Sequence, residues 1–252
     1  MAQPISFVSD GLRLAGELHL PHDSGPHPGL CICHGIPAVP YNPGDAGYHD
    51  LAARFASAGF ATLIFNFRGA GLSEGDFDMS GWSRDVGAAV TALSTTDSVD
   101  PSRIFLMGFS GGAAVSIHRA AHDERVTGVV SCASPAHFRD LVEGAALDAC
   151  ISRWREIGII RDASFPSDVD AWLSGFVEVA PVAHVARVSP RPILFIHGDA
   201  DEVVPLSHAL ELSGAAREPA QLVIVPGGAH RLRVDERAMS ASLEWLRSHA
   251  AS

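Results

Sequence analysis

Six short apolar runs recur along the chain and alternate with segments of mixed polarity. They are GLCICHG (29–35), ATLIFNF (61–67), RIFLMGF (103–109), VTGVVSC (126–132), PILFIHG (192–198) and QLVIVPG (221–227). Runs that are apolar at nearly every position are typical of parallel strands buried on both faces of a sheet. Near the start, residues 4–8 and 12–21 flank the turn signal Ser9-Asp10-Gly11, which predicts a hairpin. The pattern therefore predicts an eight-stranded, mostly parallel sheet.

Segments with helical periodicity lie between these strands. Residues 48–60, 82–93 and 235–250 place apolar side chains at helical spacing, and a glycine ends the first of them. Strands that alternate with helices imply right-handed crossovers and a sheet covered on both faces. The sequence thus predicts an α/β fold, and a chain of 252 residues can bury a large core in one such domain.

One interval interrupts the alternation. Between Pro135 and Pro190 no buried strand is evident, and residues 140–158 and 167–180 have the pattern of two or more helices. The interval is too long for a simple connection between strands. We therefore expect residues 1–134 and 191–252 to form the core, with residues 135–190 inserted as a helical cap over one edge of the sheet.

A serine stands among glycines where a predicted strand passes into a predicted helix. The stretch Gly108-Phe109-Ser110-Gly111-Gly112 fits the G-x-S-x-G pattern. Such a tight turn pushes the serine out at the top of the sheet, and side chains two positions away on either side would collide. The first turn of the following helix offers free N–H groups, which suit a developing oxyanion. An ordinary glycine-rich turn is the alternative, and the strand–helix context disfavours it.

A nucleophilic serine needs a base, and the base needs an acid that orients it. Asp199, Asp201 and Glu202 follow the predicted strand at 192–198, and His230 follows the one at 221–227 after two glycines. The order Ser110, Asp201, His230 is the chain order expected of such a triad on this kind of sheet. A solvated loop histidine is the alternative interpretation of His230.

These segments resemble the α/β-hydrolase superfamily over almost the whole chain, from about residue 5 to 248. The resemblance rests on CHGIP, FNFRGAGLSEG, GFSGG, HGDADEVVP and GGAHRL. It implies that Asp201 is the triad acid, with Asp199 as the second candidate, and that no cofactor or metal is required. It further implies that the backbone N–H groups of Ile36 and Gly111 hold the oxyanion, and that His34 is structural.

Within the superfamily, the chain is most similar to small bacterial serine esterases of the feruloyl-esterase and dienelactone-hydrolase-like branches. Catalytic domains of prolyl-oligopeptidase-type enzymes are similar too. The resemblance implies a carboxylesterase that cleaves small-molecule esters through an acyl-enzyme. Other acyl-transfer enzymes with the same triad (a peptidase, thioesterase or acyltransferase) remain open, as does a non-catalytic binding module.

Composition and charge narrow the choice of partners. The formal charge of −11 argues against nucleic acid or an anionic membrane as the main partner. All 18 basic residues are arginine, which excludes a P-loop lysine, a Schiff-base lysine and a Ser-Lys dyad. Neither a secretory signal nor an apolar run of about 20 residues is visible. We therefore expect a cytoplasmic protein, and the sequence leaves its oligomeric state open.

The sequence offers weaker evidence for a nucleotide site, for an aromatic substrate pocket and for a metal site. GAGLSEG (69–75) has Glu74 where a dinucleotide fingerprint needs its third glycine, and Asp76 and Asp78 are interpreted as a solvated loop. Aromatic residues of the insertion could line a substrate pocket or form the insertion's own core; they are Trp154, Phe165, Trp172 and Phe176. Four histidines show no recognisable metal-ligand spacing; they are His137, His184, His197 and His208.

Overall fold

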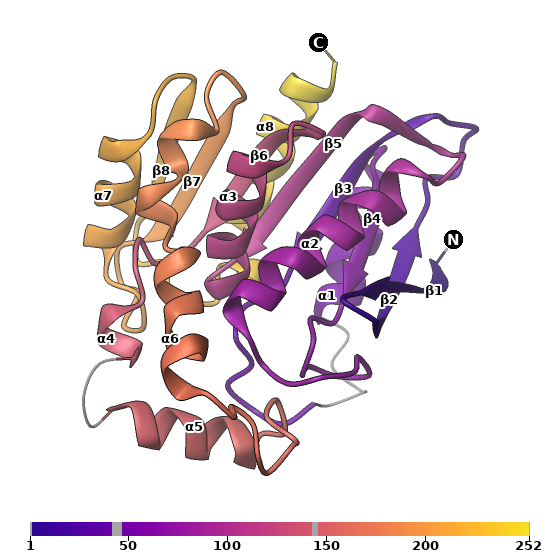
Figure 1. Ribbon diagram of the computed structural model, residues 1–252. Coiled ribbons are helices and arrows are strands. Elements are labelled where there is room, and N and C mark those ends of the chain that lie inside the picture. Colours follow the sequence, from indigo (N-terminus) through magenta and orange to yellow (C-terminus); the bar gives the residue numbers. More distant parts are fainter. Residues whose placement is uncertain (1, 42–46, 143–145, 252) are drawn as a thin grey trace.

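A single eight-stranded sheet forms the centre of the protein in the computed structural model, which describes residues 2–41, 47–142 and 146–251 (Figure 1). The strand order is β1-β2-β4-β3-β5-β6-β7-β8. Pairing is antiparallel for β1–β2 and β2–β4 and parallel elsewhere, which confirms the predicted mostly parallel sheet. The strands are β1 (Ala2–Ser9), β2 (Leu12–His19), β3 (His27–Cys33), β4 (Ala61–Phe65), β5 (Val99–Phe109), β6 (Val126–Cys132), β7 (Ile193–Gly198) and β8 (Ala220–Val225).

The first two strands form the predicted hairpin. Asp10 and Gly11 connect them, with φ angles of 50° and 80°. Two consecutive positive φ values give a turn whose twist matches that of the flanking strands, and Asp-Gly is a favoured sequence for it.

Helices cover both faces of the sheet. α1 (Gly47–Ser57) and α8 (Glu236–Ala250) lie on one face. α2 (Met79–Ser94), α3 (Gly111–His122) and α7 (Leu206–Ala215) lie on the other, in front of the sheet in Figure 1. No helix in the described part of the chain is long and apolar enough to span a membrane.

Alternating side chains of β5 explain why its sequence is apolar throughout. Phe105 and Met107 belong to the core beneath α1 and α8, whereas Ile104 and Leu106 belong to the core beneath α2 and α3. Both sets are fully buried. Such two-faced burial is what distinguishes a central parallel strand from a half-exposed one.

The segment between β6 and β7 carries three helices and two 3₁₀ turns, and no strand among its described residues. They are α4 (Arg139–Val142), α5 (Ala146–Glu156), α6 (Val169–Glu178), η1 (Pro181–Ala183) and η2 (Val185–Arg187). In Figure 1, α5 runs across the lower end of the molecule, beyond the carboxyl ends of the central strands. The helical character predicted for this segment is therefore confirmed.

The large aromatic residues of this segment form a core with the loop that precedes α2. Trp154, Trp172 and Phe176 surround Phe77, at ring-centroid distances of 4.8, 6.4 and 5.9 Å. Each of the three is at most 5% exposed, and Trp172 Nε1 donates a hydrogen bond to the carbonyl of Phe77. Of the two interpretations of these side chains, the structure supports a core.

The loop between β4 and α2 carries the two acidic residues Asp76 and Asp78, and both accept hydrogen bonds from backbone N–H groups. Asp78 caps α2 by accepting a hydrogen bond from Gly81 N at 3.0 Å. Asp76 accepts from the backbone N–H groups of Arg161 and Asp162, and so binds the loop to the segment after α5. Both residues are half-buried, and each carboxylate accepts hydrogen bonds from backbone donors, so these side chains also organise the loop.

Candidate active site

Ser110 lies at the turn from β5 into α3, in a backbone conformation that few residues adopt. Its φ is 53°, in the left-handed region. A Cβ on Gly108 would lie 2.4 Å from Ala113 Cα, and a Cβ on Gly112 would lie 2.2 Å from the carbonyl oxygen of His34. Real side chains do not tolerate such contacts, so both glycines are required if the turn is to close around Ser110.

The loop after β3 packs directly against this turn. A Cβ on Gly35 would lie 3.1 Å from Ser110 Cβ, and one on Gly111 would lie 2.9 Å from Ile36 Cγ1 and 3.7 Å from Ile36 N. The backbones at Ile36 and Gly111 are thus close neighbours beside Ser110. Gly111 is the first residue of α3, where N–H groups lack acceptors within the helix.

His230 and Asp201 are joined by a hydrogen bond. His230 Nδ1 donates to Asp201 Oδ2 at 2.8 Å, although the two residues come from different loops, after β8 and β7. The Asp201 side chain is completely buried, and that of His230 is 21% exposed. With its proton on Nδ1, a neutral His230 has its lone pair on Nε2.

Asp201 is held in place by backbone donors as well. Its Oδ1 accepts hydrogen bonds from Val203 N at 2.9 Å and Val204 N at 2.8 Å. Burial alone would raise the pKa of this carboxyl, but the hydrogen bonds from His197, His230 and these two N–H groups together hold its pKa well below its usual range. The carboxylate therefore stays ionised beside the imidazole.

Asp199, the second candidate acid, faces another partner. Its Oδ1 accepts a hydrogen bond from Gly227 N at 2.6 Å and so connects the loops after β7 and β8. Among the described contacts, it is Asp201 and not Asp199 that meets His230.

His197 contributes to the same site, although the sequence analysis considered it only as a metal ligand. The residue is 1% exposed, and its Nε2 donates to the carbonyl of Val204 at 2.8 Å. The same Nε2 lies 3.4 Å from Asp201 Oδ2. Its place four residues before Asp201, in HGDADEVVP, was the available signal that the two side chains would lie close together.

His34 has both ring nitrogens engaged with the backbone. Its Nδ1 donates to the carbonyl of Gly35 at 2.7 Å, and its Nε2 accepts from Phe67 N at 3.3 Å. The ring packs edge-on against Phe67 and Trp82, and burial lowers its pKa. A histidine with neither nitrogen available supports the shape of the loop rather than proton transfer.

Ser110 and His230 line the same cleft, whose volume is about 710 Å³. The segment after α5 contributes Ile157, Ile159 and Arg161 to its wall. Further lining residues are apolar or aromatic, among them Ile36, Val39, Tyr48, Leu72, Phe109 and Leu232, or polar and charged, among them Glu17, His49, Asn66, Arg231 and Arg233. Burial raises the pKa of Tyr48 to about 12, so its hydroxyl stays protonated.

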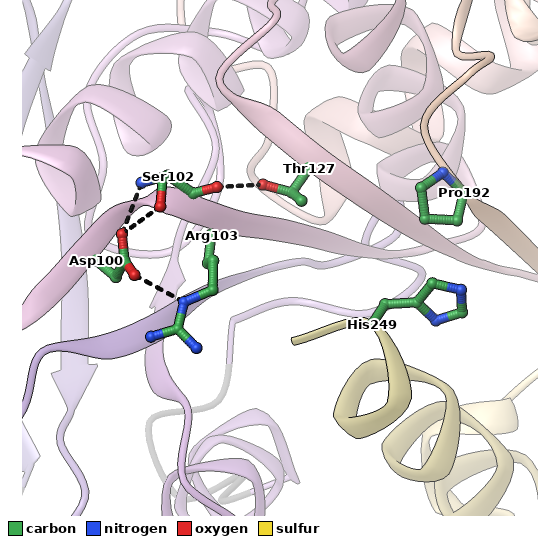
Figure 2. A pocket seen from close by; sticks show the side chains of 6 residues that line it. All are labelled: Asp100, Ser102, Arg103, Thr127, Pro192 and His249. Atoms are coloured by element: carbon green, nitrogen blue, oxygen red, sulfur yellow. Dashed lines mark hydrogen bonds and ion pairs between the residues drawn. The ribbon is translucent and has the colours of Figure 1, made fainter. Parts of the chain in front are cut away.

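A second hollow, of about 480 Å³, lies at the opposite edge of the sheet (Figure 2). This hollow lies where β5, β6 and β7 begin, because its lining includes Asp100, Thr127 and Pro192. Ser110, in contrast, follows the end of β5. Asp100 bonds Ser102 and Arg103 within the hollow, as Figure 2 shows. Its polar groups already have partners, and it is remote from the cleft.

Comparison with known proteins gives the family. The prolyl oligopeptidase family matches residues 48–252, which is more than half of the chain. The chain belongs to this family of serine hydrolases. An uncharacterized protein of Mycobacterium tuberculosis, Rv2307c, is 32% identical over 225 residues, a match that covers 88% of this chain and 70% of that protein.

Solved structures share the fold at lower identity. The α/β hydrolase GrgF from Penicillium has a TM-score of 0.77 at 23% identity and covers both chains completely. Est1E from Butyrivibrio proteoclasticus has a TM-score of 0.71 at 20% identity and covers 99% of both chains; it has also been solved with ferulic acid bound. The fold is therefore that of the α/β hydrolases, as the sequence predicted.

Proposed function

We propose that this serine hydrolase is a carboxylesterase that uses Ser110, His230 and Asp201 as its catalytic triad. The observation that carries the proposal is the 2.8 Å hydrogen bond from His230 Nδ1 to the buried Asp201, in a cleft that His230 shares with Ser110. These are the nucleophile, base and orienting acid that acyl transfer needs.

In the first half-reaction, His230 Nε2 accepts the proton of Ser110 Oγ while Oγ attacks the acyl carbon of the ester. Asp201 keeps the proton of the neutral imidazole on Nδ1, and then stabilises the positive charge that His230 acquires. His230 returns the proton to the leaving alkoxide, and the acyl group stays on Ser110. Water then attacks this acyl-enzyme by the same route, with His230 again as base and acid.

The negative charge that develops on the carbonyl oxygen needs donors fixed in advance. We assign this role to the backbone N–H groups of Ile36 and Gly111, because their backbones are adjacent beside Ser110. The amino-terminal end of α3 adds a favourable dipole. Fixed donors of this kind contribute about 3 kcal/mol or more to lowering the barrier.

Residues 135–190 serve as a cap in this proposal. Their part in the cleft is the short stretch around Ile157, Ile159 and Arg161, which follows α5. Arg153 on α5 also donates a hydrogen bond to the carbonyl of Ala38, another residue that lines the cleft. Apolar side chains elsewhere in the cleft, such as Ile36, Val39 and Phe109, favour acyl or aryl groups of small to medium size.

An ester substrate suits the site better than a peptide. An ester needs only a nucleophile, a base and oxyanion donors, which are the roles that this proposal gives to Ser110, His230 and the N–H groups of Ile36 and Gly111. A peptidase must in addition hold the chain on both sides of the scissile bond, usually through polar groups. Apolar side chains such as Ile36, Val39 and Phe109 line the cleft together with Ser110 and favour an acyl group, beside charged residues such as Arg231 and Arg233. The membership in a family named for an oligopeptidase keeps amide cleavage as the second candidate.

The experiment compares three probes with matched acyl groups: a p-nitrophenyl ester, a thioester and an aminoacyl p-nitroanilide. The proposal expects the highest kcat/KM for the ester and little turnover of the anilide, with all activity lost in Ser110→Ala. A higher kcat/KM for the anilide would instead assign the site to peptides, and turnover by Ser110→Ala would remove Ser110 from the mechanism.

A further inference from the structure

Three histidines gather at the end of α3 that is remote from Ser110. His118 and His122 lie one turn apart in the helix, and His184 comes from the link between η1 and η2. Their ring centroids are 4.6, 4.6 and 5.0 Å apart, which is close to an equilateral triangle. One nitrogen from each ring lies within 4.8 Å of the other two.

The hydrogen bonds of these rings fix which nitrogen carries the proton. His122 Nδ1 lies 2.8 Å from the carbonyl of His118, and His184 Nε2 lies 2.7 Å from the carbonyl of Glu178. A carbonyl only accepts, so both nitrogens must be donors. The lone pairs of the neutral rings are therefore on His122 Nε2 and His184 Nδ1.

The ring of His118 can also have its lone pair on the nitrogen that faces the other two histidines. His118 Nδ1 lies 2.7 Å from Ser83 Oγ, which can accept its proton and leave the lone pair on Nε2. His184 Nδ1 is buried and has no hydrogen-bond partner. A buried acceptor without a donor is costly, unless a positive ion or a proton fills the position that it faces.

We propose that His118, His122 and His184 form a binding site for a divalent transition-metal ion of the zinc type. Three imidazole nitrogens and one open position, which water would fill, make the tetrahedral set that Zn²⁺ prefers. His122 and His184 donate their other N–H to backbone carbonyls, and that of His118 faces Ser83 Oγ; such contacts are the outer support that metal-binding histidines usually have. A site without carboxylates does not suit Mg²⁺ or Ca²⁺.

Some of the charges around the three histidines favour the binding of a cation, and others oppose it. The carboxyl-terminal end of α3 and Glu178 favour a cation. Against it, the exposed Arg187 donates to His122 Nε2 at 2.9 Å and must swing away when the ion binds.

An ion at this position would crosslink α3 to the link between η1 and η2, at the end of the segment between β6 and β7. α3 starts immediately after Ser110, and η1 and η2 lead into β7, which ends just before Asp199. The inferred role is structural, since the cluster lies a helix length from Ser110. This separates it from the catalytic proposal, which requires no metal.

The test uses the whole protein, stripped of metal by a chelator and then titrated with Zn²⁺ by calorimetry and with Co²⁺ by visible spectroscopy. We expect one ion per chain, tetrahedral Co²⁺ absorption and a higher Tm with Zn²⁺. His122→Ala and His184→Ala should each weaken binding at least tenfold. His122 is exposed, so its variant is expected to keep the fold, and circular dichroism and fluorophosphonate labelling check this.

Two further variants make the outcome specific. Arg187→Gln should strengthen Zn²⁺ binding several-fold, because it removes a positive charge and a competing donor; unchanged or weaker binding would overturn the arrangement. His49→Ala is the matched control, because Glu17, His19 and His49 form another group with metal-ligand atoms. Binding that survives in His122→Ala but disappears in His49→Ala would overturn the proposal, as would the absence of binding.

Discussion

One carboxylate oxygen of Asp201 accepts a hydrogen bond from His230, and the other accepts from two backbone N–H groups. Hydrogen bonds on both oxygens therefore fix the position of this side chain. Oδ2 accepts from His230 Nδ1 at 2.8 Å, while Oδ1 accepts from Val203 N and Val204 N at 2.9 and 2.8 Å. The carboxylate can therefore neither rotate nor reach solvent without losing hydrogen bonds. Its hydrogen bond to Nδ1 in turn fixes the orientation of the His230 imidazole.

The first prediction concerns this acid. Asn in place of Asp201 would keep the two backbone hydrogen bonds through Oδ1, but its NH₂ group would face His230 Nδ1. The imidazole would then carry its proton on Nε2, where it cannot accept from Ser110. We expect Asp201→Asn to fold normally and to lower kcat by roughly four orders of magnitude, measured on a p-nitrophenyl ester.

Asp199→Asn is the matched control, with the same substitution two residues away. An asparagine there can still accept from Gly227 N through Oδ1. Its kcat should remain within a few-fold of the wild type. If Asp199→Asn were the more damaging of the two variants, the assignment of the acid would be wrong.

The second prediction concerns the nucleophile. The turn at Ser110 presents one hydroxyl in the cleft beside His230. A fluorophosphonate probe should therefore label the protein in a 1:1 ratio, and Ser110→Ala should abolish labelling, as intact-mass spectrometry would show. Ser134→Ala, at a buried serine outside the cleft residues, should leave labelling intact. Labelling that persists in Ser110→Ala would show that another residue is the nucleophile.

The third prediction tests the steric requirement of the turn. A Cβ on Gly112 would lie 2.2 Å from the carbonyl oxygen of His34, and backbone atoms cannot move aside cheaply. We expect Gly112→Ala to lower the free energy of unfolding by about 1–3 kcal/mol or more, measured by urea denaturation.

Gly214 provides the contrast, because it lies in α7 and a Cβ there would meet nothing within 4 Å. Gly214→Ala should raise the free energy of unfolding by about 0.5–1 kcal/mol, through its better helix propensity. Similar destabilisation by both substitutions would mean that the close approach at Gly112 does not decide its identity.

The sheet and the order of the candidate site residues were predictable because they depend on local pattern. Continuous apolar runs mark the buried strands, and Ser110, Asp201 and His230 each follow such a run directly. The helix α7 was not predicted. Only Ala209 and Leu212 are buried in it, so its sequence shows almost no apolar stripe.

Contacts between distant segments were not predictable. His118 and His122 have helical i, i+4 spacing, but nothing local indicates that His184 joins them, because three helices and their loops separate β6 from η1 and η2. The choice between core and pocket for Trp154 and Trp172 depended on where Phe77 lies, which is set by the path of another loop. Sequence periodicity shows which face of a helix or strand is buried, but not which other segment packs against that face.

The last prediction separates the stability of the segment between β6 and β7 from the selection of substrates. Trp154 is 5% exposed and packs on Phe77 at 4.8 Å, whereas Leu72 is 64% exposed and lines the cleft. We expect Trp154→Ala to lower the free energy of unfolding by about 3–5 kcal/mol. Leu72→Ala should change it by no more than about 0.5 kcal/mol.

The substrate profile should respond in the opposite order. Leu72→Ala removes apolar surface from the cleft that Ser110 also lines, and each methylene of contact in an apolar pocket contributes about 1–3 kcal/mol to selection between acyl groups. We therefore expect kcat/KM for longer p-nitrophenyl esters to fall several-fold relative to the acetate, while folded Trp154→Ala keeps the wild-type ranking. If instead Trp154→Ala reordered the esters and Leu72→Ala did not, selection would depend on the aromatic core, and the cleft walls named above would not be the ones that contact the acyl group.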